Sequence, residues 1–187
     1  MKFISLTERV HFYFNQIIKN GDCVLDATAG KGHDTLYLAK LVGDKGKVYA
    51  FDIQEEALHI TEKRLIKAGM LERVILIQDS HDRLSYYDIP PLKAAVFNLG
   101  YLPGGDHSII TMAESTCQAI SQLYKLIITD GIIIITSYRE HAGGMKEYQA
   151  LKDHLIKEES RGLKTTVISP LTENKNAPVI FIVQKEL

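Results

Sequence analysis

The chain has 187 residues, of which 45% are apolar and 24% charged, a composition typical of a globular protein that can bury one sizeable core. No Pro-, Gly- or Ser-rich stretch divides it, so we expect one domain over residues 1–187. The net charge of −1 excludes a strongly basic protein that neutralises many phosphates at once, so an RNA substrate would need a local basic patch.

The pattern of residues also argues against export and against metal binding. Glu8 and Arg9 soon interrupt the apolar start of the chain, so we expect neither a signal peptide nor a membrane span, and a cytoplasmic protein. Cys23 and Cys117 lie far apart, and the seven histidines show no H-x-x-x-H pattern. We therefore expect no disulfide and no metal site.

Helix and strand patterns alternate through the first half of the chain. Apolar residues recur at helical spacing between residues 6 and 17, and Asn20-Gly21 ends this helix before an apolar strand at 23–25. The pattern then predicts a helix, a strand and a helix over residues 33–42, 47–51 and 55–68. The order is therefore βαβα after the first helix.

The second half continues this alternation until its last two strands. The predicted elements are strands at 73–78 and 94–98, a helix at 111–127, a strand at 132–135, a helix at 143–159 and strands at 164–168 and 178–184. A loop without helical pattern joins the last two strands, and it cannot make the crossover that parallel neighbours need, so the last strand should be antiparallel. Seven strands with the last reversed and helices on both faces resemble the α/β, Rossmann-like fold of class I methyltransferases.

The stretch between the first strand and the next helix is the most informative. Gly30 and Gly32 lie where the backbone must turn tightly and approach a ligand closely. A dinucleotide fingerprint would have a third glycine in place of Thr35, and Asp34 would repel a pyrophosphate at the helix N-terminus. S-adenosylmethionine carries no phosphate, and its sulfonium and amino groups are cationic, so Asp26 and Asp34 favour this cofactor.

Later loops add candidates for the same cofactor. Asp52, at the end of the second strand, can accept hydrogen bonds from both ribose hydroxyls, and Lys31 can meet the methionine carboxylate. Asp79 follows the third strand, where methyltransferases contact adenine, although a plain polar loop is the alternative. The complete set of candidate cofactor residues is Asp26, Thr28, Gly30, Lys31, Gly32, His33, Asp34, Thr35, Asp52, Ile53, Gln54, Asp79, Ser80, His81 and Asn98.

The fourth strand leads into a second Gly- and Pro-rich loop that begins with Asn98-Leu99-Gly100-Tyr101. This loop resembles the N-P-P-Y loop of amino-methylating enzymes, in which the Asn and backbone carbonyls hold a nitrogen by its hydrogens and direct its lone pair at the methyl group. Leu99 and Gly100 stand where that pattern has prolines. A simple turn is the alternative, but Asn98 followed by Tyr101 favours a functional loop.

Three segments together resemble one small bacterial family: Asp-Ala-Thr-x-Gly-x-Gly-x-Asp-Thr from Asp26, Phe51-Asp52-Ile53-Gln54, and the stretch from Phe97 to Pro103. The family, long described as rRNA methylases, comprises the tRNA 5-aminomethyl-2-thiouridine methyltransferases, and the resemblance spans nearly the full chain. It implies that S-adenosylmethionine is used to convert the aminomethyl group of the wobble uridine into methylaminomethyl. It also implies the tRNA anticodon stem-loop as partner.

Candidate RNA contacts follow from the loops at the same sheet edge. We expect Tyr101 or Tyr138 to stack on a splayed anticodon base and Arg139 to hold a phosphate. Lys146 and Lys175 would extend a local basic patch. Exposed Tyr and Arg residues are also common on surfaces that bind nothing.

The predicted reaction is in-line displacement by a neutral amine, in which positioning does much of the work. Asn98 and Tyr101 are the candidate catalytic residues, and His141 is a candidate acceptor for the proton that is lost. The main alternative is methylation of rRNA or of another amine or amide. A non-enzymatic module that binds the cofactor and a dehydrogenase are further alternatives, and a homodimer would join two small basic patches.

Overall fold

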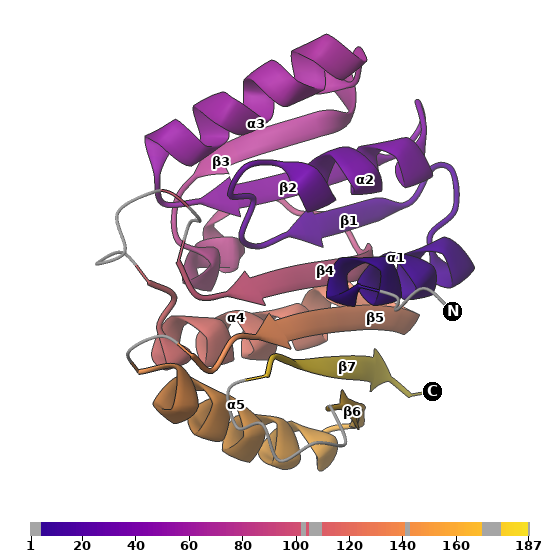
Figure 1. Ribbon diagram of the computed structural model, residues 1–187. Coiled ribbons are helices and arrows are strands. Elements are labelled where there is room, and N and C mark those ends of the chain that lie inside the picture. Colours follow the sequence, from indigo (N-terminus) through magenta and orange to yellow (C-terminus); the bar gives the residue numbers. More distant parts are fainter. Residues whose placement is uncertain (1–4, 102–103, 105–109, 141–142, 170–176, 187) are drawn as a thin grey trace, which may run out of the picture.

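The computed structural model describes residues 5–101, 104, 110–140, 143–169 and 177–186. Within these residues one sheet in the order β3-β2-β1-β4-β5-β7-β6 forms the middle layer (Figure 1). Its strands are β1 (Cys23–Asp26), β2 (Lys47–Asp52), β3 (Val74–Gln78), β4 (Leu92–Leu99), β5 (Ile127–Ser137), β6 (Leu163–Ile168) and β7 (Val179–Lys185). Strands β1 to β5 pair in parallel, whereas β7 is antiparallel to both β5 and β6. The predicted reversal of the last strand is confirmed.

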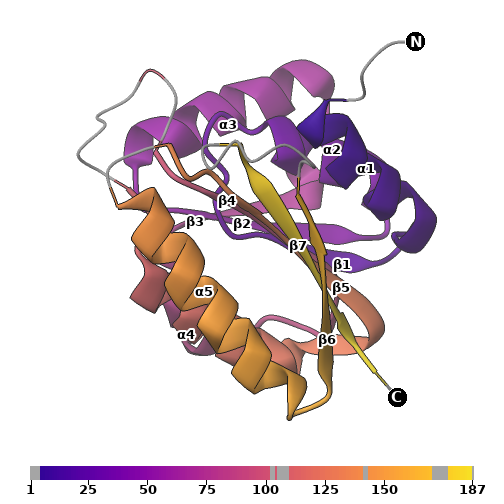
Figure 2. The same ribbon diagram turned by 60° about the horizontal axis from the view of Figure 1, so that its bottom comes forward.

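Helices cover both faces of this sheet (Figure 2). They are α1 (Leu6–Ile17), α2 (His33–Val42), α3 (Glu55–Ala68), α4 (Ala113–Leu126) and α5 (Gly144–Glu159). One buried cluster joins α1, α2 and α3 to the sheet through residues such as Phe14, Leu38 and Leu65. A second cluster joins α4 and α5 to the opposite face through residues such as Leu123 and Leu151. The three-layer α/β arrangement is therefore confirmed.

The fold departs from the sequence prediction at a few element boundaries. Strand β5 begins at Ile127, directly after α4, and not at residue 132. Its first part is interrupted at Asp130, which has a φ of 61°, and residues 128–130 are exposed, so the apolar pattern breaks there. Two short 3-10 helices, η1 (Leu71–Arg73) and η2 (His81–Tyr86), were also not predicted, because they are too short to show a periodic apolar stripe.

Among the described residues, no helix combines the length and the apolar character that crossing a membrane requires. Within the same residues, no group of His, Cys, Asp and Glu side chains is arranged to hold a metal ion. Cys23 and Cys117 are both free thiols.

Candidate functional site

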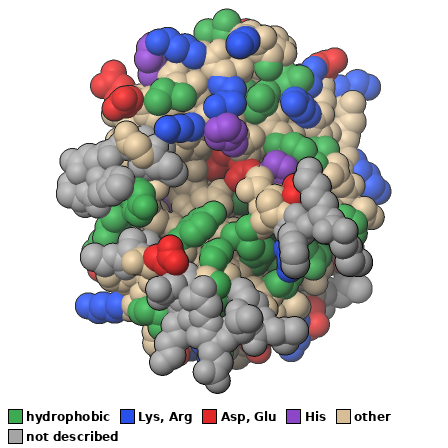
Figure 3. Space-filling view, viewed as in Figure 1, with side chains coloured by type: hydrophobic (Ala, Val, Ile, Leu, Met, Phe, Trp, Pro, Cys, Tyr) green, Lys and Arg blue, Asp and Glu red, His purple; other side chains and the backbone are tan. Residues whose placement is uncertain are grey.

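The candidate site lies at the carboxyl ends of the central parallel strands, where open α/β folds bind their ligands. β1 ends at Asp26, β2 at Asp52 and β4 at Leu99, and these three strand ends lie along one edge of the sheet (Figure 1). On this side of the molecule, Figure 3 shows a hollow near the carboxyl end of β1, with acidic and histidine side chains at its rim. The predicted candidates from separate loops are therefore brought together.

The loop between β1 and α2 is held tightly against α3. Gly30 and Gly32 have φ values of 52° and 73°, in the left-handed region that favours glycine. The Thr61 hydroxyl donates to the carbonyl of Gly30 over 3.0 Å. A Cβ on Gly32 would lie only 2.6 Å from that same hydroxyl oxygen, so no larger residue fits there. Both predicted glycines thus shape the turn.

Asp52 braces the same loop from the end of β2. One carboxylate oxygen accepts from the backbone N–H of Gly30 at 2.8 Å, and the other accepts from the backbone N–H of Gln54 at 2.9 Å. Burial raises the pKa of Asp52, and these hydrogen bonds oppose the rise. Each oxygen keeps a further lone pair, so the carboxylate can still accept hydrogen bonds from a ribose.

Asp26 is completely buried, which distinguishes it from the other candidate carboxylates. The Thr35 hydroxyl donates to one of its oxygens at 2.6 Å, and the Thr28 backbone N–H approaches the other at 3.2 Å. Burial, followed by the charge of Asp34, raises the pKa of Asp26 to about 7. The structure therefore places this carboxyl group beneath the loop, where it ties β1 to the start of α2.

Asp34 connects three elements at the rim of the site. One carboxylate oxygen accepts from the Asn98 side-chain amide at 2.7 Å, and the other lies 2.8 Å from Nε2 of His11 on α1. The backbone N–H of Asn98 donates to the Thr28 hydroxyl at 2.8 Å. Sequence reasoning missed His11, because it lies in a helix that carries no recognised motif.

The loop after β3 contributes a buried acceptor. Nδ1 of His81 lies 3.1 Å from the carbonyl of Ala27, so it carries the proton, and burial lowers the pKa of the ring. Nε2 of His81 is buried and has no hydrogen-bond partner among the residues that the structure describes. Asp79 instead accepts from the Ser80 backbone N–H at 2.8 Å and from the Tyr87 hydroxyl at 2.9 Å.

The orphaned Nε2 of His81 indicates a ligand donor at this position, because buried acceptors are almost always paired. Burial lowers the pKa of His81 and so favours the neutral ring, in which Nε2 is an acceptor. A nucleoside with hydroxyl and amino donors matches an acceptor set of Asp52 and His81. The residues present therefore fit S-adenosylmethionine.

Both tyrosines that were predicted to contact RNA are partly exposed. Tyr101 is 41% exposed and forms an isolated antiparallel bridge with Ile110, which closes the base of the loop after β4. Tyr138 is 42% exposed, and burial together with the charge of Asp34 raises its pKa. Both residues therefore reach the surface of the protein.

The cationic residues that were predicted to contact RNA differ in their surroundings. Arg139 donates from Nε and Nη2 to the carbonyl of Ala177, at 2.9 and 2.6 Å, and its guanidinium lies 5.2 Å from the centre of the Tyr148 ring. These contacts tie the end of β5 to the start of β7. Lys146 is exposed on α5, and the predicted site residues His141 and Lys175 lie outside the described residues.

Arg64 on α3 is a cation that the sequence did not single out. Its Nε donates to the carbonyl of Lys31 at 2.7 Å, and its Nη2 donates to Nε2 of His33 at 3.1 Å. Burial and the charge of Arg64 lower the pKa of His33. Lys and Arg side chains gather over α2 and α3 in the upper part of Figure 3, beside the hollow. No local spacing in the sequence predicts the contact between Arg64 and Lys31, since the two residues are 33 positions apart.

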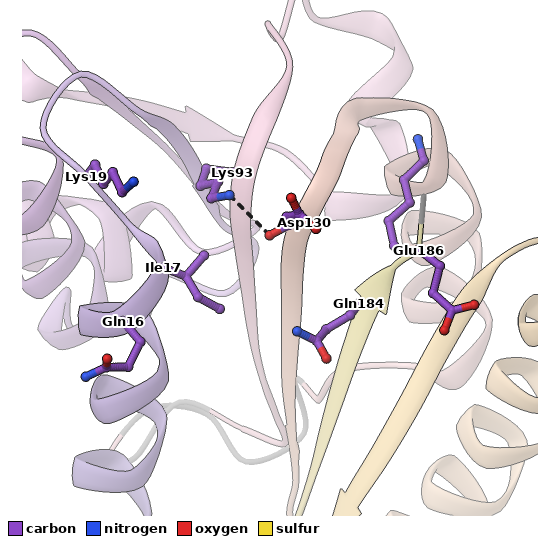
Figure 4. Close-up of a pocket in the computed structure, with 8 residues that line it drawn as sticks. Gln16, Ile17, Lys19, Lys93, Asp130, Gln184 and Glu186 are labelled. Atoms are coloured by element: carbon purple, nitrogen blue, oxygen red, sulfur yellow. Dashed lines mark hydrogen bonds between the residues drawn. The ribbon is translucent and has the colours of Figure 1, made fainter.

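A cavity of about 700 Å³ opens at the opposite edge of the sheet (Figure 4). It is lined by Gln16, Ile17, Lys19, Lys93, Asp130, Gln184, Lys185 and Glu186. Within it, Lys93 donates to the carbonyl of Asp130 at 3.2 Å, and Lys185 is held by the carbonyls of Tyr124 and Ile127. Both lysines are thus used inside the protein, and the candidate site remains at the carboxyl edge.

Comparison with known proteins shows the family to which the chain belongs. Residues 48–184 match the family model described as "Putative rRNA methylase". The chain belongs to this family. Its sequence is 36% identical to that of a putative rRNA methylase from Clostridium thermocellum. The crystal structure of that protein matches this one with a TM-score of 0.94, over 99% of this chain and 100% of that chain. This chain is 31% identical to a putative methyltransferase from Streptococcus mutans in complex with SAH, with a TM-score of 0.86 over 99% of each chain.

A curated relative adds a more specific similarity. The chain is 39% identical over 158 residues to the chloroplastic tRNA (mnm(5)s(2)U34)-methyltransferase of Arabidopsis thaliana. The match covers 78% of this chain and 57% of that protein, so the chain spans little more than half the length of this relative. This member of the rRNA methylase family has the fold of class I methyltransferases, and its cofactor is S-adenosylmethionine, as the sequence predicted.

Proposed function

We propose that the chain methylates the primary amine of 5-aminomethyl-2-thiouridine at the wobble position of tRNA, which gives 5-methylaminomethyl-2-thiouridine. The similarity to the Arabidopsis thaliana enzyme supports this substrate. The observation that carries the proposal is the hydrogen bond from the Asn98 amide to Asp34. It fixes a polar side chain at the end of β4, on the site's rim, where it can orient an amine.

The cofactor supplies an electrophilic methyl group on a sulfonium. For its binding we propose Asp52 for the ribose hydroxyls, His81 together with Asp79 for the adenine and Lys31 for the methionine carboxylate. Asp52 and His81 offer acceptors from β2 and from the loop after β3. The remaining predicted cofactor residues stay candidates; they lie at the ends of β1 and β4, in the first turn of α2 and in the turns that follow β1, β2 and β3.

The chain's own residues then have to hold an amine in its neutral form, because a protonated amine has no lone pair. The new N–C bond forms as the C–S bond breaks, the electron pair stays on sulfur, and the nitrogen releases one proton. We assign Asn98 to orienting the amine and Tyr101 to closing the site above it, with His141 as candidate proton acceptor. Oriented reactants account for much of the rate in such displacements.

The tRNA contacts that we propose differ in part from those expected from the sequence. Tyr101 and Tyr138 remain candidates for stacking on a splayed base. Arg139, which donates to the carbonyl of Ala177, stays a candidate for a phosphate contact, and Arg64 and the exposed Lys63 on α3 are further candidates. Lys146 and Lys175 stay candidates, and a homodimer and a cytoplasmic location stay predictions.

Nucleoside analysis tests this function directly. Purified protein would be incubated with S-adenosylmethionine and tRNA bearing 5-aminomethyl-2-thiouridine, and digested nucleosides would be analysed by mass spectrometry. We expect the methylaminomethyl product. A protein that binds the cofactor but leaves this tRNA unchanged would contradict the wobble-uridine assignment. The family's description makes rRNA the second candidate, to be offered in the same assay.

A further inference from the structure

The helix α1 contributes a side chain to the candidate site. We infer that His11, acting through Asp34, fixes the orientation of the Asn98 amide so that its oxygen faces the acceptor amine. His11 and Asp34 would then be positioning residues. The inference rests on the proposed function, since it gives a reason why an amine is the group that is methylated.

The identities of the atoms follow from hydrogen-bond chemistry. An ionised carboxylate only accepts hydrogen bonds, so the Asn98 atom 2.7 Å from Asp34 must be the NH₂ group. The amide oxygen of Asn98 is thereby turned to the other side of the amide. An amide oxygen is an acceptor, so it pairs with a group that carries hydrogens, such as an amine, and not with a carbonyl. The Asp34 contact therefore selects the class of acceptor.

His11 restrains the other half of the Asp34 carboxylate. Its Nε2 lies 2.8 Å from Oδ1 of Asp34, which makes Nε2 the protonated nitrogen. The His11 ring stacks on Tyr37 with centroids 3.5 Å apart and planes inclined by 3°, so the ring itself is held in place. Without His11, the carboxylate would be free to rotate and the Asn98 amide would lose its fixed partner.

His11 and Asp34 are partly buried, which strengthens the hydrogen bond between them. The side chains of His11 and Asp34 are only 20% and 15% exposed. Hydrogen bonds to charged groups in such partly buried settings are stronger than exposed ion pairs. Asn98 is fixed from a second direction as well, by the bond from its backbone N–H to Thr28. Backbone and side chain of Asn98 are thus restrained independently.

A double-mutant cycle tests whether His11 works through Asp34. His11→Ala should lower kcat for tRNA about tenfold, with the Kd for S-adenosylmethionine and the KM for tRNA changed less than about twofold. In an Asp34→Ala background, His11→Ala should lower kcat no further. His11→Gln keeps an N–H donor and should recover most of the rate. His59→Ala, which removes an exposed histidine from α3, is the matched control.

The inference would be overturned if His11→Ala lowered kcat equally in the wild-type and Asp34→Ala backgrounds. It would also be overturned if His59→Ala lowered kcat as much as His11→Ala does. A second readout does not depend on the substrate. NMR signals of the Asn98 side-chain NH₂ should shift in Asp34→Ala and in His11→Ala but not in His59→Ala. Signals unchanged in His11→Ala would refute the positioning role. If the two variants show these shifts but the wild-type protein leaves the tRNA unmodified, only the proposed substrate is contradicted.

Discussion

Asp26 has no solvent exposure, yet it lies within reach of two other carboxylates. Desolvation favours its neutral form, and the charges of Asp34 and Asp52 act in the same direction. When the carboxyl is neutral, its hydroxyl can donate to Thr35, because that threonine hydroxyl also accepts hydrogen bonds. Asp26 is therefore a structural carboxyl group whose ionisation costs free energy.

This ionisation predicts a pH dependence of stability. The pKa of Asp26 is near 3.8 when the chain is unfolded and about 7 when it is folded, so between these values the folded state binds more protons. The contribution of Asp26 to the free energy of unfolding is therefore largest below about pH 4, falls as the pH rises to 7, and then stays constant. Asn in this position can donate to Thr35 and accept from Thr28 without ionising.

Asp26→Asn should consequently gain stability relative to the wild type as the pH rises, by roughly 2 to 4 kcal/mol between pH 4 and pH 8. Urea denaturation of both proteins at pH 4, 6 and 8 measures this difference. Titrating groups that do not interact with Asp26 are common to both proteins and cancel in the comparison. A difference that does not change with pH would show that Asp26 is ionised throughout the range.

Asn98 is the residue whose loss should separate binding from chemistry. Because its side chain belongs to the amine side of the proposed site, Asn98→Ala should bind S-adenosylmethionine normally and lose on the order of a hundredfold in turnover. Calorimetry measures the first quantity, and nucleoside mass spectrometry measures the second. Turnover close to that of the wild type would remove Asn98 from the mechanism.

The connection between β1 and α2 is the element that depends most on glycine. Gly32→Ala combines a φ of 73° with a Cβ placed 2.6 Å from the Thr61 hydroxyl, which is itself held by the Gly30 carbonyl. We expect a loss of about 2 to 4 kcal/mol in the free energy of unfolding and weaker cofactor binding. Chemical denaturation and calorimetry measure these effects.

Gly69 at the end of α3 provides the matched control. Its φ is 67°, nearly that of Gly32, but an added Cβ would meet no atom within 4 Å. Gly69→Ala should therefore cost only the backbone strain, about 1 kcal/mol, and leave cofactor affinity unchanged. Equal losses in the two variants would mean that contact with Thr61 contributes nothing.

At the scale of elements, the sequence predicts what periodicity and loop composition encode. The glycine turn, Asp52 at the end of β2 and the reversed β7 all follow from local patterns, and the structure contains them. The contacts of Arg64 and His11 join residues more than 20 positions apart, so no local spacing indicates them. The sequence predicts Arg139 as a surface residue that binds phosphate, but it cannot show that this side chain donates a hydrogen bond to the carbonyl of Ala177.

At the scale of the whole molecule, a net charge of −1 conceals an uneven distribution. The basic side chains over α2 and α3 lie beside the hollow, whereas α5 covers the opposite face of the sheet (Figures 2 and 3). Lys63 precedes Arg64 on α3 and is exposed, and Lys152 is exposed on α5. If RNA lies along the α3 side, these two lysines should differ in their effect on tRNA binding.

Lys63→Glu should raise the KM for tRNA about fivefold and lower the salt dependence of tRNA binding by about one unit of slope, because one phosphate contact is lost. The rate at saturating tRNA should stay unchanged, since Lys63 is remote from the reacting amine. Lys152→Glu makes the same change of charge on the other face and should affect neither quantity. Filter binding over a range of salt concentrations, together with steady-state kinetics, measures both variants. If Lys152→Glu weakens binding and Lys63→Glu does not, the RNA must approach from the α5 side, with Lys146 as its nearest predicted contact.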